Sequence, residues 1–171
     1  MTSSPTWSAT LAGGRGNGSW TPASFYLNAG GLLALSIGAA HAHLGRAGWS
    51  IGVFCLAFTA LVVVLLGLWD EFGTGDDLSV HTRLTFFLGP LYLAGPLLMA
   101  SGAATVSRGV ARAFVASAGL WLVLATGFKL APDAWDGIVE KAAIAATLLW
   151  TLPLAGLQIA EGRTLATRPA P

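Results

Sequence analysis

The chain has 171 residues, of which 54% are apolar and only 10% are charged, and its mean hydropathy is +0.68. A soluble globular domain carries about 25% charged residues, so this composition excludes an ordinary water-soluble protein. Nine basic and eight acidic residues nearly cancel, which leaves no basic field for a nucleic-acid backbone. The single cysteine, Cys55, excludes a disulfide framework and a cysteine-based zinc site.

The first segment is predicted to be a polar leader. Residues 1–23 are rich in glycine, serine, threonine and proline and carry one charge, Arg15. They lack the charged segment followed by an apolar core that defines a signal peptide. We therefore expect a flexible or loosely packed segment before the apolar part of the chain begins.

Five apolar stretches follow the leader, and each is long enough to cross a membrane. A transmembrane helix needs about 20 apolar residues to cross a hydrocarbon core of about 30 Å. No stretch carries a charge near its centre. The sequence thus predicts an all-α, polytopic bundle of five transmembrane helices over residues 24–160 and a short cytoplasmic tail over 161–171. The predicted spans are Ser24–Leu44, Ser50–Trp69, Leu84–Val106, Val110–Leu130 and Ile138–Ala160.

The third span contains two prolines that are expected to kink it. Pro90 and Pro96 each remove a backbone donor and crowd the preceding helical turn. In the first span, Ala34 and Gly38 lie four residues apart, a spacing that brings small residues together on one helix face. We expect such residues to let neighbouring helices approach closely.

The charges predict which side of the membrane each loop faces. Short cytoplasmic loops are enriched in lysine and arginine. The side that holds the first–second loop, the third–fourth loop and the C-terminal tail carries five arginines and one acid, Glu161, whereas the other side carries four basic residues and seven acids. We therefore predict a multi-pass protein of the cell membrane with its N-terminus outside and its C-terminus in the cytoplasm.

The seven acids on the outer side gather near His81 and Lys141. One interpretation is structural, because Asp76 and Asp77 follow a glycine and precede an apolar helix, as N-caps do. The other is a catalytic site in which His81, Glu140, Asp76 and Asp77 are the acid and base candidates, because partial burial adapts such groups to proton transfer near neutral pH. The sequence leaves both interpretations open.

Two polar stripes are predicted to descend from this outer cluster. A period of 3.6 residues puts His81, Thr85 and Tyr92 on one side of the third helix, and Glu140 and Thr147 on one side of the fifth. The alternatives are that the threonine hydroxyls bond their own helix and that the midplane tryptophans fill the bundle core. The candidate ligand-binding residues are Thr85, Tyr92, Lys141, Thr147, Trp121 and Trp150.

No metal or cofactor site is predicted. His41 and His43 are two residues apart, so on a helix they point in nearly opposite directions and cannot chelate one ion. The segment Asp70–Asp77 is rich in carboxylates but lacks the ligand spacing of an EF-hand. The chain has no phosphate-binding loop, zinc-protease motif or dinucleotide fingerprint, so no cofactor is expected.

Four short segments from Phe25 onward follow an order that is known from a membrane protein family. They are Asn28–Leu33, Phe86–Leu91 after the loop that leads to His81, Asp136–Lys141 and Leu148–Trp150. In this order the chain resembles the bacterial and archaeal family called domain of unknown function 998. Members usually have a histidine at the first of these helix starts and a Gly-x-x-Glu-Arg pattern at the last, where this chain has Lys141 in place of arginine.

The resemblance implies one more helix at the N-terminus, which this sequence lacks. The stretch Ser4–Trp7 looks like the outer loop that would follow that helix. Either the chain is a natural short form or its true start lies further upstream. A sixth helix would place the N-terminus inside without changing the orientation of the other five, and the family implies no activity.

Three classes of function remain open. The first is a non-enzymatic bundle that binds lipid or supports a larger membrane complex, and the lack of motifs and of midplane charge favours it. The second is a membrane-embedded enzyme that acts on a lipid or isoprenoid by acid–base chemistry at the outer face. The third is a small transporter. The expected partners are membrane lipids and other membrane protein subunits, and no nucleic acid.

Overall fold

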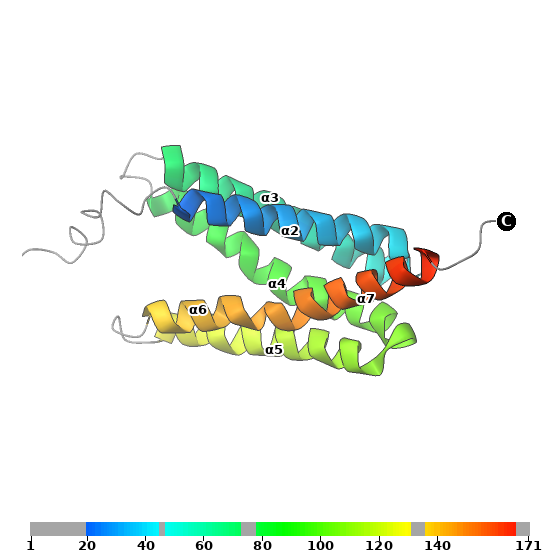
Figure 1. Cartoon of the computed structure of the whole chain (residues 1–171). Helices are drawn as coiled ribbons and strands as arrows, with labels where there is room; N and C mark the ends of the chain where they lie inside the picture. The colour runs from blue at the N-terminus through cyan, green and yellow to red at the C-terminus, as the bar shows by residue number, and fades with distance from the viewer. Residues whose placement is uncertain (1–19, 45–46, 73–77, 131–135, 167–171) are drawn as a thin grey trace, which may run out of the picture.

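The computed structural model describes residues 20–44, 47–72, 78–130 and 136–166, and within these ranges it is all-helical, with no strand. Figure 1 shows the helices packed side by side along one common direction. They are α2 (Trp20–Ala42), α3 (Ala47–Phe72), α4 (Leu78–Val106), α5 (Arg108–Leu130), α6 (Asp136–Ala146) and α7 (Leu148–Ala166).

Five segments of these helices are long and apolar enough to cross a membrane, which confirms the predicted five-helix membrane bundle. They agree with the predicted spans to within three residues at each end. The fifth combines α6 and α7 into one crossing. The segments are Ala23–Ala42, Ala47–Leu68, Arg83–Val106, Arg108–Gly127 and Lys141–Arg163.

The helices are arranged as a ring in which sequence neighbours pack together. Helix α3 packs most extensively, against α2 on one side and α4 on the other, and α5 lies between α4 and the α6–α7 pair. Contacts between α2 and α7 close the ring, and they are far less extensive than those between α2 and α3. The bundle is therefore most open on the side where the first and last crossings meet.

The α2–α3 and α4–α5 connections lie on the side that the charges predict to be cytoplasmic. Ser107 alone links α4 to α5, and its hydroxyl accepts a hydrogen bond from the amide of Val110 at 3.4 Å, as an N-cap does. After α2, His43 has a φ of 30°, and the indole of Trp49 donates to the carbonyl of Ala39 at 2.8 Å. This carbonyl lies in the last turn of α2, where helical hydrogen bonding runs out.

The core of the bundle is filled by large side chains, and three of them, Trp49, Met99 and Trp150, pack against glycines. The largest fully buried ones include Trp49, Trp150, Phe114, Leu56 and Met99. A Cβ at Gly95 would lie 2.6 Å from the Trp150 ring. The absence of a side chain at this position thus makes room for a tryptophan at the middle of the bundle.

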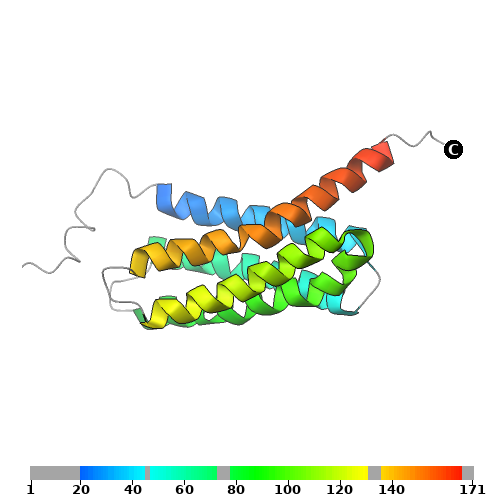
Figure 2. The same cartoon turned by 90° about the horizontal axis from the view of Figure 1, so that it is seen from below.

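The fifth crossing is not the single helix that the sequence predicts, because it breaks at Thr147. Pro153 does not make this break, because α7 begins at Leu148 and continues unbroken through Pro153. The amide of Thr147 bonds back to Ile144, three residues away, at 3.1 Å. Beyond the break α7 diverges from the other helices (Figure 2) and continues to Ala166, past the predicted end of the span at Ala160.

Hydroxyl groups satisfy the backbone at this break. The Ser117 hydroxyl of α5 donates to the carbonyl of Ala146 at 2.8 Å, and the Thr147 hydroxyl donates to Ile144 at 2.7 Å. In hydrocarbon an unpaired carbonyl is costly, so a helix is interrupted there only where side chains take over the lost bonds. Helix α4 runs unbroken from Leu78 to Val106, and its predicted kink at Pro90 and Pro96 stays a prediction.

Candidate functional site

A groove lies between α2 and the α6–α7 crossing, and we call it the lateral groove. It has a volume of about 740 Å³, within the range of small-molecule sites. Helix α2 supplies one wall, with Asn28, Gly31 and Leu35, and Tyr92 of α4 also lines it. The opposite wall runs along α6 and α7 from Lys141 to Gln158, which is about 25 Å of helix.

The lateral groove is mostly apolar between its ends and polar at them. Ile144, Leu148 and Leu152 line the middle, and about half or more of each side chain is exposed. Asn28 lies in the first half of α2 and Lys141 at the middle of α6, two helices that begin at the same end of the bundle (Figure 1). A positive charge thus lies near one end of an apolar channel that is open along its side.

Gln158 marks the other end of the lateral groove and joins its two walls. Its Nε2 donates to the carbonyl of Leu35 on α2 at 2.7 Å. A Cβ at Gly38 would overlap the Gln158 amide, so a side chain at this position would force the amide to move. The close approach predicted for Gly38 therefore occurs, between the first and the last crossing.

Three of the predicted ligand-binding residues, Tyr92, Lys141 and Thr147, line the lateral groove. The hydroxyl of Thr147 donates to Ile144, and that of Thr151, which also lines the groove, donates to Thr147 at 3.2 Å. Both hydroxyls therefore donate to their own helix backbone, which is one of the two alternatives that the sequence left open for these threonines. Thr85 is exposed on α4 and does not line the groove.

The two midplane tryptophans lie behind the lateral groove, outside its lining. Trp121 packs on Tyr92, with ring centroids 4.7 Å apart, and donates to the carbonyl of Gly89 at 3.2 Å. Trp150 is fully buried, and among the described residues its Nε1 is a buried donor without an acceptor. Tyr92 therefore forms the part of this aromatic group that reaches the groove.

The predicted catalytic residues lie largely outside the part of the chain that the structure describes. Asp76 and Asp77 fall in the undescribed segment 73–77, and only the backbone is described for His81 and Glu140. His81 belongs to α4 and Glu140 to α6, two helices that begin at the same end of the bundle and each pack on α5 (Figure 1). The acid–base site therefore stays a prediction.

The described residues contain no group of three or more histidine, cysteine, aspartate or glutamate side chains that could hold a metal ion. His41 instead bonds its own helix, with Nδ1 at 2.8 Å from the carbonyl of Ile37.

Neither a protein-family model, nor a curated protein, nor a solved structure matches the chain. The resemblance to the family called domain of unknown function 998 therefore stays a prediction.

Proposed function

We propose that this multi-spanning membrane protein binds a lipid in the lateral groove and is a non-enzymatic bundle. The observation that carries the proposal is an apolar groove of about 740 Å³ between membrane-crossing helices, with Lys141 near one end. A ligand site of this size with few polar groups suits an amphiphile with a long apolar part. A role in supporting a larger membrane complex stays a second prediction for the same bundle.

The position of the lateral groove favours a lipid over a water-soluble ligand. Its walls, α2 and α6–α7, are crossings of the bundle, so the open side of the groove faces acyl chains. The exposed side chains of Ile144, Leu148 and Leu152 offer such a chain an apolar surface. The ammonium of Lys141, five residues into α6, complements an anionic headgroup, since basic residues near a bilayer surface attract anionic lipids.

Filling the lateral groove is expected to displace the lipid. Gly31 lines the groove, and a Cβ there would meet no atom within 4 Å, so Gly31→Leu places a side chain in the groove without a clash. Native mass spectrometry of the detergent-purified protein should show a bound anionic lipid in the wild type and its loss in Gly31→Leu. Lys141→Gln should weaken the preference for anionic over zwitterionic lipid.

The neighbouring glycine provides a matched control. A Cβ at Gly30 also meets nothing within 4 Å, but Gly30 does not line the groove, so Gly30→Leu should retain the lipid. Equal lipid retention in both leucine variants, or a wild type that carries no lipid, would contradict the proposal.

We also propose the orientation that the charges predict, with the C-terminus in the cytoplasm. The α2–α3 and α4–α5 connections lie at the same end of the bundle as the end of α7 (Figure 1), so one orientation places all three basic segments inside. With Cys55 replaced by alanine, a cysteine introduced at Thr74 should react with an impermeant thiol reagent on intact cells. One introduced at Thr164 should react only after permeabilisation, and the reverse pattern would overturn the orientation.

A further inference from the structure

Tyr92 of α4 brings a hydroxyl to the wall of the lateral groove. The residue is 8% exposed, it lines the groove, and its ring packs on Trp121. Within the described part of the chain its hydroxyl has no hydrogen-bond partner. In the same residues Nε1 of Trp150 is the fully enclosed side-chain atom that lacks a partner, so the Tyr92 oxygen is not sealed in the core. The Tyr92 hydroxyl therefore opens into the groove with a proton to donate.

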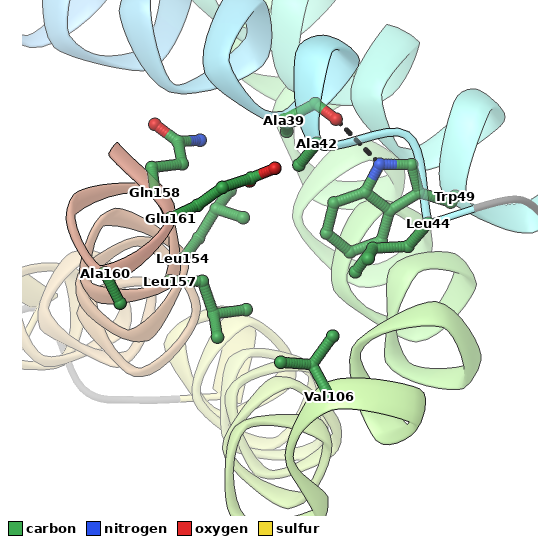
Figure 3. Close-up of a pocket in the computed structure, with 10 residues that line it drawn as sticks. All are labelled: Ala39, Ala42, Leu44, Trp49, Val106, Leu154, Leu157, Gln158, Ala160 and Glu161. Atoms are coloured by element: carbon green, nitrogen blue, oxygen red, sulfur yellow. Dashed lines mark hydrogen bonds between the residues drawn. The ribbon is translucent and has the colours of Figure 1, made fainter. Parts of the chain in front are cut away.

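Other donors that line the hollows of the described bundle are already engaged. In the lateral groove the hydroxyls of Thr147 and Thr151 donate to their own helix, and Nε2 of Gln158 donates to α2. A second hollow, of about 330 Å³, lies at the other end of the bundle from Lys141 (Figure 3). There the indole of Trp49 donates to the last turn of α2, as the dashed line marks. The Tyr92 hydroxyl is thus a buried donor that remains available to a ligand.

The Tyr92 hydroxyl lies below the level of Lys141. A Cβ at Gly95 of α4 would lie 2.6 Å from the Trp150 ring, so these two residues are at about the same level. The helices α4 and α6–α7 run in the same direction (Figure 1), and Tyr92 and Thr147 each come three residues before this pair. Thr147 lies six residues after Lys141, which is about 9 Å of helix. Because long side chains on a helix point back towards its N-terminus, the hydroxyl reaches up from this level towards the Lys141 end.

We propose that the Tyr92 hydroxyl donates a hydrogen bond to an ester carbonyl of the lipid, so that the lateral groove selects an ester-linked glycerolipid over an ether-linked one. This inference rests on the proposed function, in which a lipid fills the groove. An ester carbonyl is a hydrogen-bond acceptor, and it lies directly below the headgroup of a glycerolipid. An ether-linked lipid lacks this carbonyl, so the buried hydroxyl would face hydrocarbon, which is unfavourable for an unpaired donor.

Two phosphatidylglycerols test the preference, because they differ only in the two carbonyls. Diphytanoyl phosphatidylglycerol is ester-linked, and diphytanyl phosphatidylglycerol has the same headgroup and branched chains on ether links. The full chain is equilibrated in detergent with equal amounts of both, and native mass spectrometry separates the two complexes by mass. The wild type should carry the ester lipid in about fivefold excess, as expected for one hydrogen bond.

Tyr92→Phe removes the hydroxyl and keeps the ring that packs on Trp121. The variant should lose the ester excess, because its binding of the ester lipid falls while its binding of the ether lipid stays as in the wild type. A merely structural role of Tyr92 would lower the binding of both lipids equally. An ester excess in Tyr92→Phe equal to that of the wild type would overturn the proposal.

The other tyrosine of the chain, Tyr26, provides a matched control. It lies on α2 against α3, where a Cβ at Gly67 would be 3.2 Å from its ring, and it does not line the lateral groove. Tyr26→Phe should therefore keep the ester excess of the wild type. Loss of the excess in Tyr26→Phe as well would contradict the assignment to Tyr92.

Gly31→Leu separates a failure of this inference from a failure of the proposed function. Both lipids should be lost from this variant, since its side chain fills the groove. Equal amounts of the two lipids on the wild type, with loss of both in Gly31→Leu, would overturn the ester preference and leave lipid binding in the groove intact. A wild type that retains neither lipid would overturn both.

Discussion

Gly52→Ala is expected to destabilise the bundle by roughly 1–3 kcal/mol, the usual cost of forcing an extra group into a packed interface. A Cβ at Gly52 of α3 would lie 2.9 Å from the carbonyl oxygen of Gly95 on α4 and would overlap the side chain of Met99. Met99 is fully buried, and a backbone carbonyl cannot rotate away, so the two helices have to separate. Thermal unfolding in detergent should show a lower midpoint for the variant.

Two further glycine variants make this prediction specific to the α3–α4 interface. Gly48→Ala should have a similar effect, because its Cβ would lie 2.8 Å from the carbonyl oxygen of Leu98. Gly119→Ala on α5 is the control, since its Cβ would meet nothing within 4 Å. An unfolding midpoint of Gly52→Ala equal to that of Gly119→Ala would show that α3 and α4 do not depend on this close approach.

Trp49→Phe is expected to destabilise the protein more than Trp150→Phe, by roughly 1–3 kcal/mol. The two indoles are 1% and 0% exposed, so the loss of buried volume is similar for both. The Trp49 N–H bonds the carbonyl of Ala39, and its removal leaves a carbonyl in apolar surroundings without this donor. In Trp150→Phe the same change removes a buried N–H that has no acceptor. Removing this unpaired donor offsets part of the stability that is lost with the indole's packing.

The comparison is made by measuring the unfolding free energy of both variants under identical conditions. Each variant serves as the control for the other, because the substitution is the same and both sites are fully buried. A Trp150→Phe protein that is as unstable as Trp49→Phe would mean that the Trp150 N–H has a partner in the folded protein.

The five crossings could be predicted from the sequence because their signal is local. A run of about 20 apolar residues bounded by charges is sufficient to locate a crossing, whichever helices it packs against. The apolar runs and the charges that bound them therefore predicted each end of each crossing to within three residues. The order of helices around the ring follows in part from short connections, such as Ser107 between α4 and α5.

The break at Thr147 was not predicted, and no proline marks it, because α7 continues unbroken through Pro153, six residues further on. Whether a helix can be interrupted in apolar surroundings depends on whether its neighbours provide partners for the freed backbone groups. Here Ser117 of α5 supplies a hydrogen bond to Ala146 at the break. Helix α4 keeps its continuity through Pro90 and Pro96. Single-sequence reasoning does not contain this information about neighbouring helices.

The lateral groove could be predicted only in part for the same reason. Periodicity placed Tyr92 and Thr147 on two polar stripes, one on the third helix and one on the fifth, but it does not indicate that α2 and α7 meet. Gln158 and Leu35 are 123 residues apart in the sequence, and their contact defines one end of the groove. A signal for Gln158 was present, because an amide inside an apolar span requires a partner.

The two helices that close the ring, α2 and α7, are synthesised at different times. Chain synthesis proceeds from the N-terminus, so α2 enters the membrane before α7 exists. The bond between Leu35 and Gln158 closes a loop of 123 residues and is among the last contacts that can form. Until then the face of α2 that later walls the lateral groove is covered by the bilayer itself. On the proposed function, the final crossing therefore closes beside a surface that the lipid has already reached.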